Sequence, residues 1–442
     1  MSEHLSSTRV SRRWFLGAVS ATGVGLLAAC APAAQAPATT SNATAAPAKI
    51  AAGTTITIMG SPTSITDATT KLFSVVEQKN NLKVNYVESP PVSQTYHDKL
   101  VTMFAAKDAS VDIVNTNGTV WPPEFAAAGW LVPLDKYFPA SDMQDHMPAY
   151  RKAFSYKDQL YGIAHLYDVG MMYYRKDLLD AKGLKPPATW AELVSQSKQL
   201  GANDDVVGHA SSWMKGEQIV CRLVEFIYGN GGMILDDNQA LKIDSPEAVD
   251  ALQMMMDMVH KEKVTPLAAT TWETGDARKI FTEGKSIFTT NWNFVWNQSQ
   301  ADGSKVVGNV GVALVPKMNG AKSAATLGGW GWTINAASKN VDASVAAIKT
   351  LTAPEQMKML FLEGGVVPTR LSLFKDPDFV KTYPHAQVML DIVEGAVPRP
   401  RHPRYREISE VIQTETLTAL NQQKTAKAAI SDIARNLQPL LA

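Results

Sequence analysis

The stretch TTITIM at residues 54–59 decides the fold, because its alternating β-branched and apolar residues have the period of a β-strand. An amphipathic helix is predicted near 68–78, and the strand pattern returns with LKVNYV at 82–87. A helix over 96–106 and a third strand, VDIV at 111–114, complete a β-α-β-α-β opening. This order predicts an α/β fold with a mostly parallel sheet and helices on both of its faces.

One edge of this sheet is a candidate binding site. Ligands of such sheets lie beyond the carboxyl ends of the strands. The rule selects residues 60–64, which follow the first strand, and 115–121, which follow the third.

The later part of the chain carries a second set of strand and helix patterns. Apolar and aromatic strand patterns cover 161–174 and 330–335. Helices are predicted from 177 onward and over 190–200, 217–228, 246–261, 342–351, 408–420 and 425–437. A chain of 442 residues exceeds the usual size of one compact core, so we expect two lobes with a cleft.

The first 29 residues have the pattern of an export signal. SRRWFL at 11–16 carries a twin arginine and opens an apolar run that ends with LAAC at 27–30. This run is shorter than the roughly 20 residues that cross a bilayer. We expect cleavage before Cys30 and lipidation of its sulfur, which would anchor the protein outside the plasma membrane. An uncleaved amphipathic anchor is the alternative.

Residues 30–53 are predicted to be a disordered tether. They are almost entirely Ala, Pro, Thr, Ser and Asn, a composition with too little apolar surface to offset the entropy cost of ordering. The tether would hold the folded part away from the membrane.

The charge balance restricts the class of ligand. Lys plus Arg and Asp plus Glu both total 42, so no large basic field is expected to bind nucleic acid or an anionic membrane. A neutral ligand fits this balance best. The second cysteine, Cys221, follows Ile219 and Val220, which favours a buried, inert thiol over a reactive or intermolecular one.

Signatures of catalysis and metal binding are missing from the sequence. The eight histidines are scattered, and none has the spacing of a zinc site. There is no Gly-x-Ser-x-Gly nucleophile motif. We therefore expect no catalytic residue, no metal and no cofactor.

Aromatic residues are placed as a sugar site requires. NWNFVWN at 291–297 alternates indole rings with amides, and GGWGW at 328–332 places two more on a glycine-rich backbone. A sugar ring packs its C–H face on an aromatic ring, and its hydroxyls bond amides, carboxylates and guanidinium groups. Trp292 and Trp330 are expected to face the ligand. Trp296 and Trp332 are ligand contacts or core residues, because alternate residues of a strand face opposite sides.

Several segments together resemble a known family. They are AAAGWLVPLD at 126–135, YYRKDLL at 173–179, TTNW at 289–292, GGWGW at 328–332 and PRPRHPRY at 398–405. With the signal and the tether, they make the chain similar to the extracellular solute-binding lipoproteins of ABC sugar importers (solute-binding protein family 1), and in particular to trehalose/maltose-binding proteins.

This resemblance implies a two-lobed, periplasmic-binding-protein-like fold with an interlobe cleft. Several chain crossings would join the lobes, which would close on ligand by a hinge. The first lobe would comprise residues 54–165 and 316–372, and the second lobe residues 166–315 and 373–442.

The resemblance also implies a set of ligand-binding residues. Trp292 and the pair Gly329-Trp330 match positions that stack on or hydrogen-bond the sugar. Asp168 matches an acidic residue after the first hinge strand, and Arg399 matches an arginine that forks onto sugar hydroxyls. The remaining candidates are Asn117, which lies close to a position where relatives often carry aspartate, together with Trp296 and Tyr405.

Two departures and two alternatives bear on this set. Residues 115–118 are uncharged, and 61–66 lack the acidic residue of some relatives, so trehalose and maltose themselves stay open. A neutral disaccharide or oligosaccharide is the expected ligand. Arg399 could instead be a solvated charge or touch the permease, and Asp168 could merely brace the hinge.

Two further functions remain open at this point. A surface glycoside hydrolase would need a pair of carboxylates, for which Asp168 and Glu273 are the best candidates. A peptide or polyamine ligand would need several acidic groups that the sequence does not visibly supply. The expected partners of the binding protein are a sugar and the membrane subunits of an ABC permease, and the protein itself is expected to be a monomer.

Overall fold

The computed structural model describes residues 50–441, with the exception of 61–66, 91–92, 237 and 319–320. The export signal, the lipidated Cys30 and nearly all of the tether lie outside the described residues, and so do most of the residues expected after the first strand. These expectations stay predictions.

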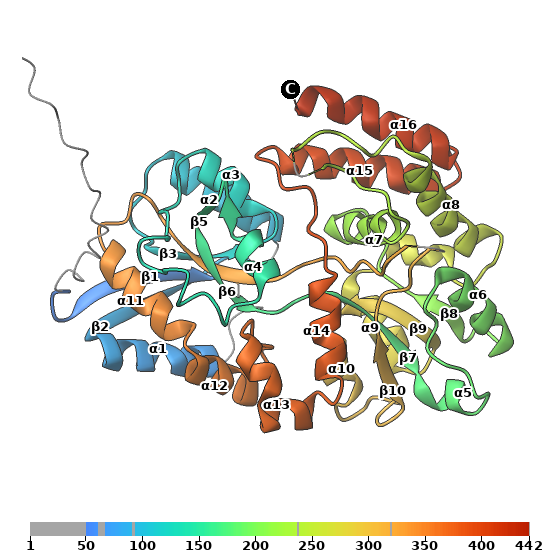
Figure 1. Cartoon of the computed structure of the whole chain (residues 1–442), viewed down its shortest axis with the longest axis horizontal. Helices are drawn as coiled ribbons and strands as arrows, with labels where there is room; N and C mark the ends of the chain where they lie inside the picture. The colour runs from blue at the N-terminus through green and yellow to red at the C-terminus, as the bar shows by residue number, and fades with distance from the viewer. Residues whose placement is uncertain (1–49, 61–66, 91–92, 237, 319–320, 442) are drawn as a thin grey trace, which may run out of the picture. The chain divides into compact units, whose positions relative to one another are not determined.

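The first sheet has the strand order β2-β1-β3-β11-β6 (Figure 1). Its strands are β1 (Thr54–Gly60), β2 (Leu82–Glu88), β3 (Ile113–Asn117), β6 (Gly162–Leu166) and β11 (Trp330–Ile334). β1, β2 and β3 run parallel, while β11 is antiparallel to both β3 and β6. With α1 (Asp67–Asn80) and α2 (Ser93–Ala105), the predicted β-α-β-α-β opening is confirmed.

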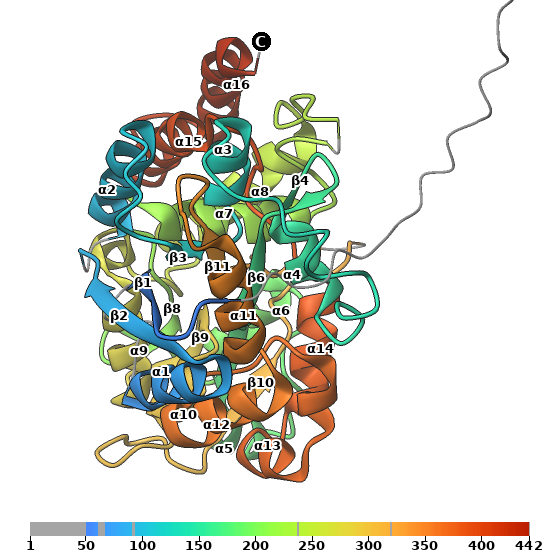
Figure 2. The same ribbon diagram turned by 90° about the vertical axis from the view of Figure 1, so that its left-hand side faces the viewer.

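Helices pack on this sheet because β1 presents apolar side chains that are buried against them. Ile56 and Ile58 of β1 are fully buried, in one apolar core with Leu72 and Val76 of α1. The other helices of this part are α3 (Trp121–Ala127), α4 (Pro148–Ala153), α11 (Val341–Leu351) and α12 (Pro354–Gly364). Helices α1 and α11 lie side by side in both views (Figures 1 and 2). A short hairpin joins β4 (Ser155–Tyr156) to β5 (Gln159–Leu160).

The second sheet has the order β10-β7-β9-β8. Its strands are β7 (Gly170–Arg175), β8 (Val207–Ala210), β9 (Ser286–Trp292) and β10 (Val310–Ala313). All seven residues of β9 are buried, as expected for a central strand covered on both faces. The predicted strand region 161–174 is therefore two strands, β6 and β7, in different sheets.

Helices surround the second sheet. Some lie between its strands in the sequence, and others lie near the C-terminal end of the chain. They are α5 (Lys176–Asp180), α6 (Trp190–Gln199), α7 (Glu217–Tyr228), α8 (Pro246–His260), α9 (Thr274–Thr282), α10 (Val295–Ser299), α13 (Pro377–Thr382), α14 (Ala386–Glu394), α15 (Tyr405–Leu420) and α16 (Ala426–Leu437), with short 3-10 turns at Leu267–Thr271, Leu371–Lys375 and Gln438–Leu440. The helices that periodicity predicts are all present, with ends shifted by a few residues. Within the described residues, no helix combines the length and the apolar composition needed to span a membrane.

Three segments cross between the two sheets and pair with one another. Val169, between β6 and β7, forms a bridge with Leu327, between β10 and β11. Thr326 in turn forms a bridge with Val397, which lies between α14 and α15. The amide of Leu327 donates to the Val397 carbonyl at 2.8 Å. These pairings form a small three-stranded junction between the sheets, at the position where the resemblance leads us to expect a hinge.

Candidate functional site

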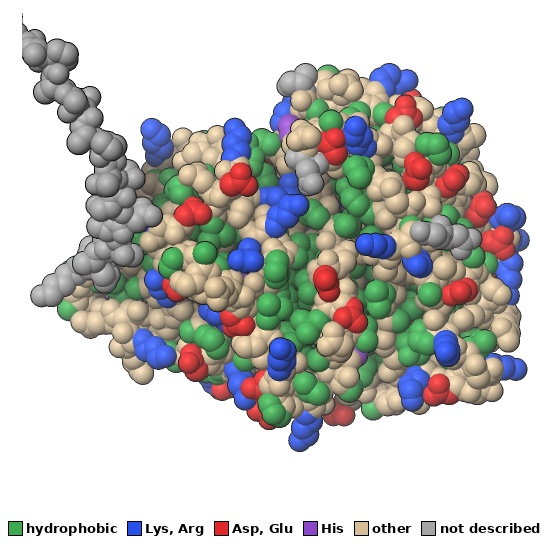
Figure 3. All heavy atoms as spheres, in the orientation of Figure 1, with side chains coloured by type: hydrophobic (Ala, Val, Ile, Leu, Met, Phe, Trp, Pro, Cys, Tyr) green, Lys and Arg blue, Asp and Glu red, His purple; other side chains and the backbone are tan. Residues whose placement is uncertain are grey.

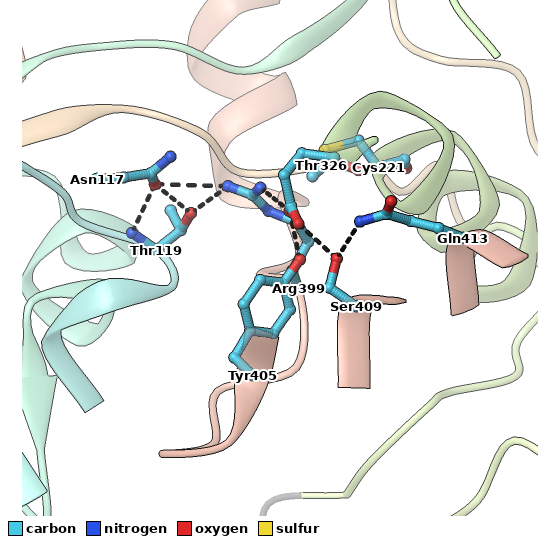
Figure 4. Close-up of polar contacts among 9 residues, drawn as sticks. Asn117, Thr119, Cys221, Thr326, Arg399, Tyr405, Ser409 and Gln413 are labelled. Atoms are coloured by element: carbon cyan, nitrogen blue, oxygen red, sulfur yellow. Dashed lines mark hydrogen bonds and ion pairs between the residues drawn. The ribbon is translucent and has the colours of Figure 1, made fainter. Parts of the chain in front are cut away.

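Arg399 lies at the centre of a buried polar network (Figure 4). Its side chain belongs to the segment between α14 and α15, and the residue is only 3% exposed. Nη2 donates to Thr119 Oγ1 at 2.7 Å and lies 3.5 Å from Asn117 Oδ1, whereas Nη1 donates to Glu217 Oε2 at 2.6 Å. Asn117 is the last residue of β3 in the first sheet, and Glu217 is the first residue of α7, a helix beside the second sheet. The Arg399 guanidinium therefore connects elements that belong to the two sheets. Burial excludes a solvated surface charge for Arg399.

Glu217 joins this candidate site although no sequence pattern pointed to it. Its carboxylate accepts hydrogen bonds from Arg399, from the Tyr405 hydroxyl at 2.5 Å and from Ser409. Both of these hydroxyl donors lie in the first turns of α15. The only local signal is an acidic residue at the start of a predicted helix, which the helix dipole alone would explain.

Asn117, which the sheet-edge rule selects, lies at the end of β3 and lines a pocket described below. Its Oδ1 accepts from Thr119 Oγ1 at 3.1 Å, so the amide oxygen is held toward the Arg399 side chain. Figure 4 shows Arg399 between Asn117 and Thr119 on one side and Tyr405 and Ser409 on the other. Three of the predicted residues, Asn117, Arg399 and Tyr405, are therefore brought together.

A pocket of about 860 Å³ opens beside this network. Its walls come from α2 and α3 on one side and from α7, α15 and α16 on the other, and both ribbon views place α2 and α3 near α15 (Figures 1 and 2). The lining includes Asn117, Trp121, Glu217, Tyr405 and several amides, namely Gln94, Gln218, Gln413 and Asn436. The pocket is thus shared between elements of the two sheets.

The charged side chains that line the pocket are already paired. Glu124 bonds the His97 ring at 2.8 Å, and Arg406 bonds Asp98 at 2.6 Å. The three remaining carboxylates form ion pairs: Glu217 with Arg399, Glu407 with Arg404 and Glu410 with Lys215. On the face drawn in Figure 3, basic and acidic side chains are likewise interspersed.

The Asp168 carboxylate and the Trp292 ring both approach Gly328 closely. A Cβ on Gly328 would lie 3.0 Å from the Trp292 ring and 3.3 Å from the Asp168 carboxylate, so glycine permits both to approach. Among the described residues, no hydrogen-bond partner reaches the buried Oδ1 of Asp168. Burial raises the pKa of Asp168 to about 7, although the positive charges of Arg399 and Arg222 act in the opposite direction.

The backbone of Asp168 has a separate role. Its carbonyl accepts from the Gly328 amide at 2.8 Å, and its own amide donates to the Tyr150 hydroxyl at 2.7 Å. These two bonds brace the hinge. The backbone alone makes these bonds, so they do not involve the carboxylate.

Trp330 is partly exposed at the start of β11. It lies parallel to Tyr96, with centroids 6.5 Å apart, and meets Trp121 edge-on at 5.4 Å. Trp121 lines the pocket, whereas Trp330 contacts Trp121 and does not itself line the pocket. Its neighbour Gly329 has a φ of +111°, and a Cβ there would come within 2.6 Å of Tyr150, which explains why glycine is required.

The other two candidate tryptophans, Trp332 and Trp296, pack against other parts of the protein. Trp332 is 2% exposed and stacks on His165 at 4.6 Å, as the core alternative predicts. Trp296 donates its indole N–H to the Thr382 carbonyl at 3.0 Å, and its ring meets His385 at 4.4 Å. The expectation of strand alternation through 291–297 was wrong, because β9 ends at Trp292 and a turn leads directly into α10.

Two further expectations concern reactive groups. Cys221 is buried in α7, as predicted, and burial raises its pKa to about 11, which disfavours the reactive thiolate. Glu273 is exposed, and its carboxylate caps α9. In the part of the chain that the structure describes, no group of three or more His, Cys, Asp or Glu residues is arranged to hold a metal ion.

Comparison with known proteins gives the same picture for sequence and structure. Residues 71–388 match the family model described as bacterial extracellular solute-binding protein. The chain is 29% identical over 366 residues to a probable ABC transporter-binding protein of Deinococcus radiodurans, covering 80% of this chain and 86% of that protein. It is 25% identical over 335 residues to a mannitol-binding protein of Pseudomonas aeruginosa, covering 72% and 74% of the two chains.

Solved structures resemble the fold over most of its length. The maltose-bound MalE3 protein of T. maritima has a TM-score of 0.79 and 34% identity, covering 88% of this chain and all of that one. A solute-binding protein of Thermotoga lettingae bound to α-D-tagatose has a TM-score of 0.76 and 27% identity, covering 89% of this chain and all of that one. The two-lobed α/β fold expected from the sequence is confirmed.

Proposed function

Because the chain belongs to the bacterial extracellular solute-binding protein family, we propose that it captures a neutral disaccharide or oligosaccharide and delivers it to an ABC import permease. Relatives that bind maltose, mannitol and α-D-tagatose support a carbohydrate or polyol ligand. In this proposal the protein binds and releases its ligand unchanged and is not an enzyme.

The observation that carries the proposal is two buried polar atoms without partners in the described part of the chain, one on Asp168 and one on Arg399, together with the close approach of the Asp168 carboxylate and the Trp292 ring at Gly328. Asp168 Oδ1 and Arg399 Nε are both buried and have no hydrogen-bond partner among the described residues. Leaving such groups unpaired costs about 1–3 kcal/mol each, so they are expected to have a partner in the working protein. An acceptor, a donor and the ring of Trp292 match the hydroxyl edge and the C–H face of a sugar.

The pocket supports an uncharged ligand of more than one ring. Its charged groups are already paired, so an ionic ligand would have to break an existing pair. Its volume of about 860 Å³ lies near the upper end of the usual range for small-molecule sites. The amides that line it provide both donors and acceptors for sugar hydroxyls.

The lobes and the anchor belong to the same proposal. The first lobe comprises 54–165 and 316–372 and the second lobe 166–315 and 373–442, a division supported by the membership of the strands in the two sheets. The three paired crossings act as the hinge. The proposed protein works as a monomer outside the plasma membrane, lipid-anchored through Cys30.

The two alternative functions have less support. A hydrolase would need a second carboxylate near Asp168, but Glu273 is exposed, caps α9 and does not line the pocket. A polyamine would need unpaired carboxylates, whereas those of the pocket are bonded to cations or to His97.

A thermal-shift screen with mono-, di- and oligosaccharides tests the proposal. We expect one carbohydrate to raise the unfolding temperature, and Trp292→Ala and Trp330→Ala to reduce that shift. Trp130→Ala is the control, because Trp130 packs on Phe104 and Phe125, whereas Trp292 approaches Asp168 at Gly328 and Trp330 contacts the pocket residue Trp121. A shift that survives both substitutions would show that the site is misplaced, and release of reducing ends would favour the hydrolase.

A further inference from the structure

We propose that Arg222 and Glu225 of α7 are positioning residues that fix the Trp292 indole for its ligand and tie it to the hinge. The proposal rests on the proposed function in one respect, namely that a ligand packs on Trp292. Neither residue lines the pocket, and no local sequence pattern points to them.

Arg222 places a cation over the Trp292 ring. The residue is 3% exposed, and its guanidinium carbon lies 5.2 Å from the ring centroid. A guanidinium in this position is attracted to the electron-rich face of the indole. The guanidinium therefore contacts one face of Trp292, a residue that is 8% exposed as a whole, and the proposal assigns the ligand to the opposite face.

Glu225 holds Arg222 and the hinge at the same time. It is fully buried, and its Oε2 accepts from Arg222 Nη1 at 2.7 Å. Its Oε1 accepts from the backbone amide of Thr326 at 3.3 Å, in the crossing segment between β10 and β11. A Cβ on Gly170 would lie 2.2 Å from this oxygen, so glycine at 170 leaves room for the carboxylate.

These contacts form a closed ring that returns to Trp292. The Thr326 carbonyl accepts from the Gly170 amide at 3.1 Å, and Gly170 pairs directly with Trp292 between β7 and β9. The indole is thus connected to the hinge through Arg222 and Glu225, and the backbone of the same tryptophan is connected to it through Gly170. Movement of the ring and movement of the hinge segment are constrained together.

Helix α7 holds the hinge at a second point one turn earlier. The Thr326 hydroxyl donates to the Cys221 carbonyl at 2.6 Å. Thr326 also forms the bridge with Val397, two residues before Arg399. Because Glu217 of the same helix bonds Arg399, residues 217, 221 and 225 connect α7 to both sides of the candidate site.

Stability alone is a poor explanation for a fully buried ion pair. Removing two charges from water is costly, and well-packed apolar side chains of similar volume often stabilise a protein as well or better. The arrangement of Arg222 and Glu225 is instead what a fixed ring orientation requires, since the ring is held by a directional contact whose partner is itself held at two points.

A first test needs no ligand. Fluorine NMR of the protein labelled with 5-fluorotryptophan reports the surroundings of each indole, and Trp292→Phe identifies the resonance of residue 292. Arg222→Met should shift that resonance, and Arg222→Lys should shift it less because a cation is kept. Arg370→Met is the matched control, since it breaks a partly buried pair with Asp145 elsewhere in the fold. An unchanged Trp292 resonance in Arg222→Met would overturn the proposal.

A second test is a double-mutant cycle with ligand. The probe is whichever of maltose, maltotriose, trehalose and mannitol binds the wild-type protein most tightly by calorimetry. We expect Arg222→Met and Glu225→Gln each to weaken binding about tenfold in the wild-type background and less than about twofold in Trp292→Ala. Equal losses in both backgrounds would show that the two residues act independently of the ring and would refute the proposal.

The two tests separate this inference from the proposed function. If none of the four probes binds but the Trp292 resonance responds as expected, the proposed function is in error and the positioning role stands. If a probe binds through Trp292 and the resonance does not respond, the positioning role is wrong and the proposed function stands. Should Arg222→Met fail to fold, Glu225→Gln keeps the size of the side chain and carries both tests.

Discussion

Arg399 Nη1 lies 2.6 Å from Glu217 Oε2, and this buried contact connects the hinge segment to the first residue of α7. The same guanidinium donates to Thr119, which follows β3. Glu217 also accepts from Tyr405, so the polar contacts of the candidate site converge on one pair. A side chain that bonds elements around both sheets is expected to affect ligand geometry and lobe closure together.

Replacing Arg399 by lysine should weaken ligand binding. A lysine ammonium cannot reach Glu217 and Thr119 in the fork geometry of a guanidinium, so at least one charge-assisted hydrogen bond is lost. We expect a loss of about 2 kcal/mol, or roughly 30-fold in Kd, by calorimetry. Arg404→Lys is the control, because Arg404 is exposed and bonds Glu407 and the Pro439 carbonyl rather than Glu217 and Thr119. Equal losses in the two variants would contradict the assigned role of Arg399.

Asp168 should make stability depend on pH. Burial raises its pKa from the usual value of 3.8 to about 7, so the folded protein binds an extra proton between these two values. The contribution of Asp168 to the free energy of unfolding is therefore largest below about pH 4, falls by up to about 1.4 kcal/mol per pH unit as the pH rises, and levels off above about pH 7. Urea unfolding of wild type and Asp168→Asn between pH 5 and pH 8 should show this slope only in the wild type.

The same carboxylate should couple ligand binding to proton release. Hydroxyl groups that donate to Asp168 favour its ionised form, so affinity should rise as the pH increases through about 7. Calorimetry near pH 6.5 in phosphate and in imidazole buffer should then give different binding enthalpies. An identical enthalpy in both buffers would mean that the ligand does not contact the carboxylate.

Much of the fold could be predicted from local sequence patterns, because strands and helices depend on the spacing of apolar residues that are close in the sequence. The strand at 54–59, the helix at 217–228 and the parallel opening all follow from the spacing of apolar residues. The strand-end rule located Asn117 for the same reason, since it needs only the end of β3. The pattern failed at Trp296, where a two-residue turn separates a strand from a helix.

The centre of the site could not be predicted in this way. Glu217 meets Arg399, Tyr405 and Ser409 across 182, 188 and 192 residues of chain, and no local period records such contacts. The roles of Arg222 and Glu225 are equally difficult to predict from the sequence, because a charged pair on a helix normally indicates a solvated face. Only the fold shows that this part of α7 is buried against the hinge.

The ion pair between Arg406 and Asp98 should slow ligand release in a salt-dependent manner. These exposed side chains connect α15 to α2 at 2.6 Å, across the pocket. An exposed pair contributes at most about 1 kcal/mol, so Arg406→Gln should raise the dissociation rate about two- to fivefold at low salt. At roughly 1 M salt the wild type and the variant should converge, because screening removes the attraction. Stopped-flow fluorescence measures both rates, and a difference that persists at high salt would contradict an electrostatic role.

Gly329→Ala should destabilise the protein much more than another glycine substitution with a similar backbone. Gly329 has a φ of +111°, and a Cβ would lie 2.6 Å from the Tyr150 ring and 2.8 Å from the Leu166 carbonyl. Gly303 has a φ of +87° with nothing within 4 Å, so Gly303→Ala measures the conformational cost alone, about 1 kcal/mol. The added clash should bring the loss for Gly329→Ala to about 3 kcal/mol by urea unfolding.

Since Tyr150 also bonds the Asp168 amide, the clash should displace the hinge, and ligand affinity should fall in Gly329→Ala but not in Gly303→Ala. Similar free energies of unfolding for the two variants would mean that the backbone at Trp330 relaxes more easily than its close packing indicates.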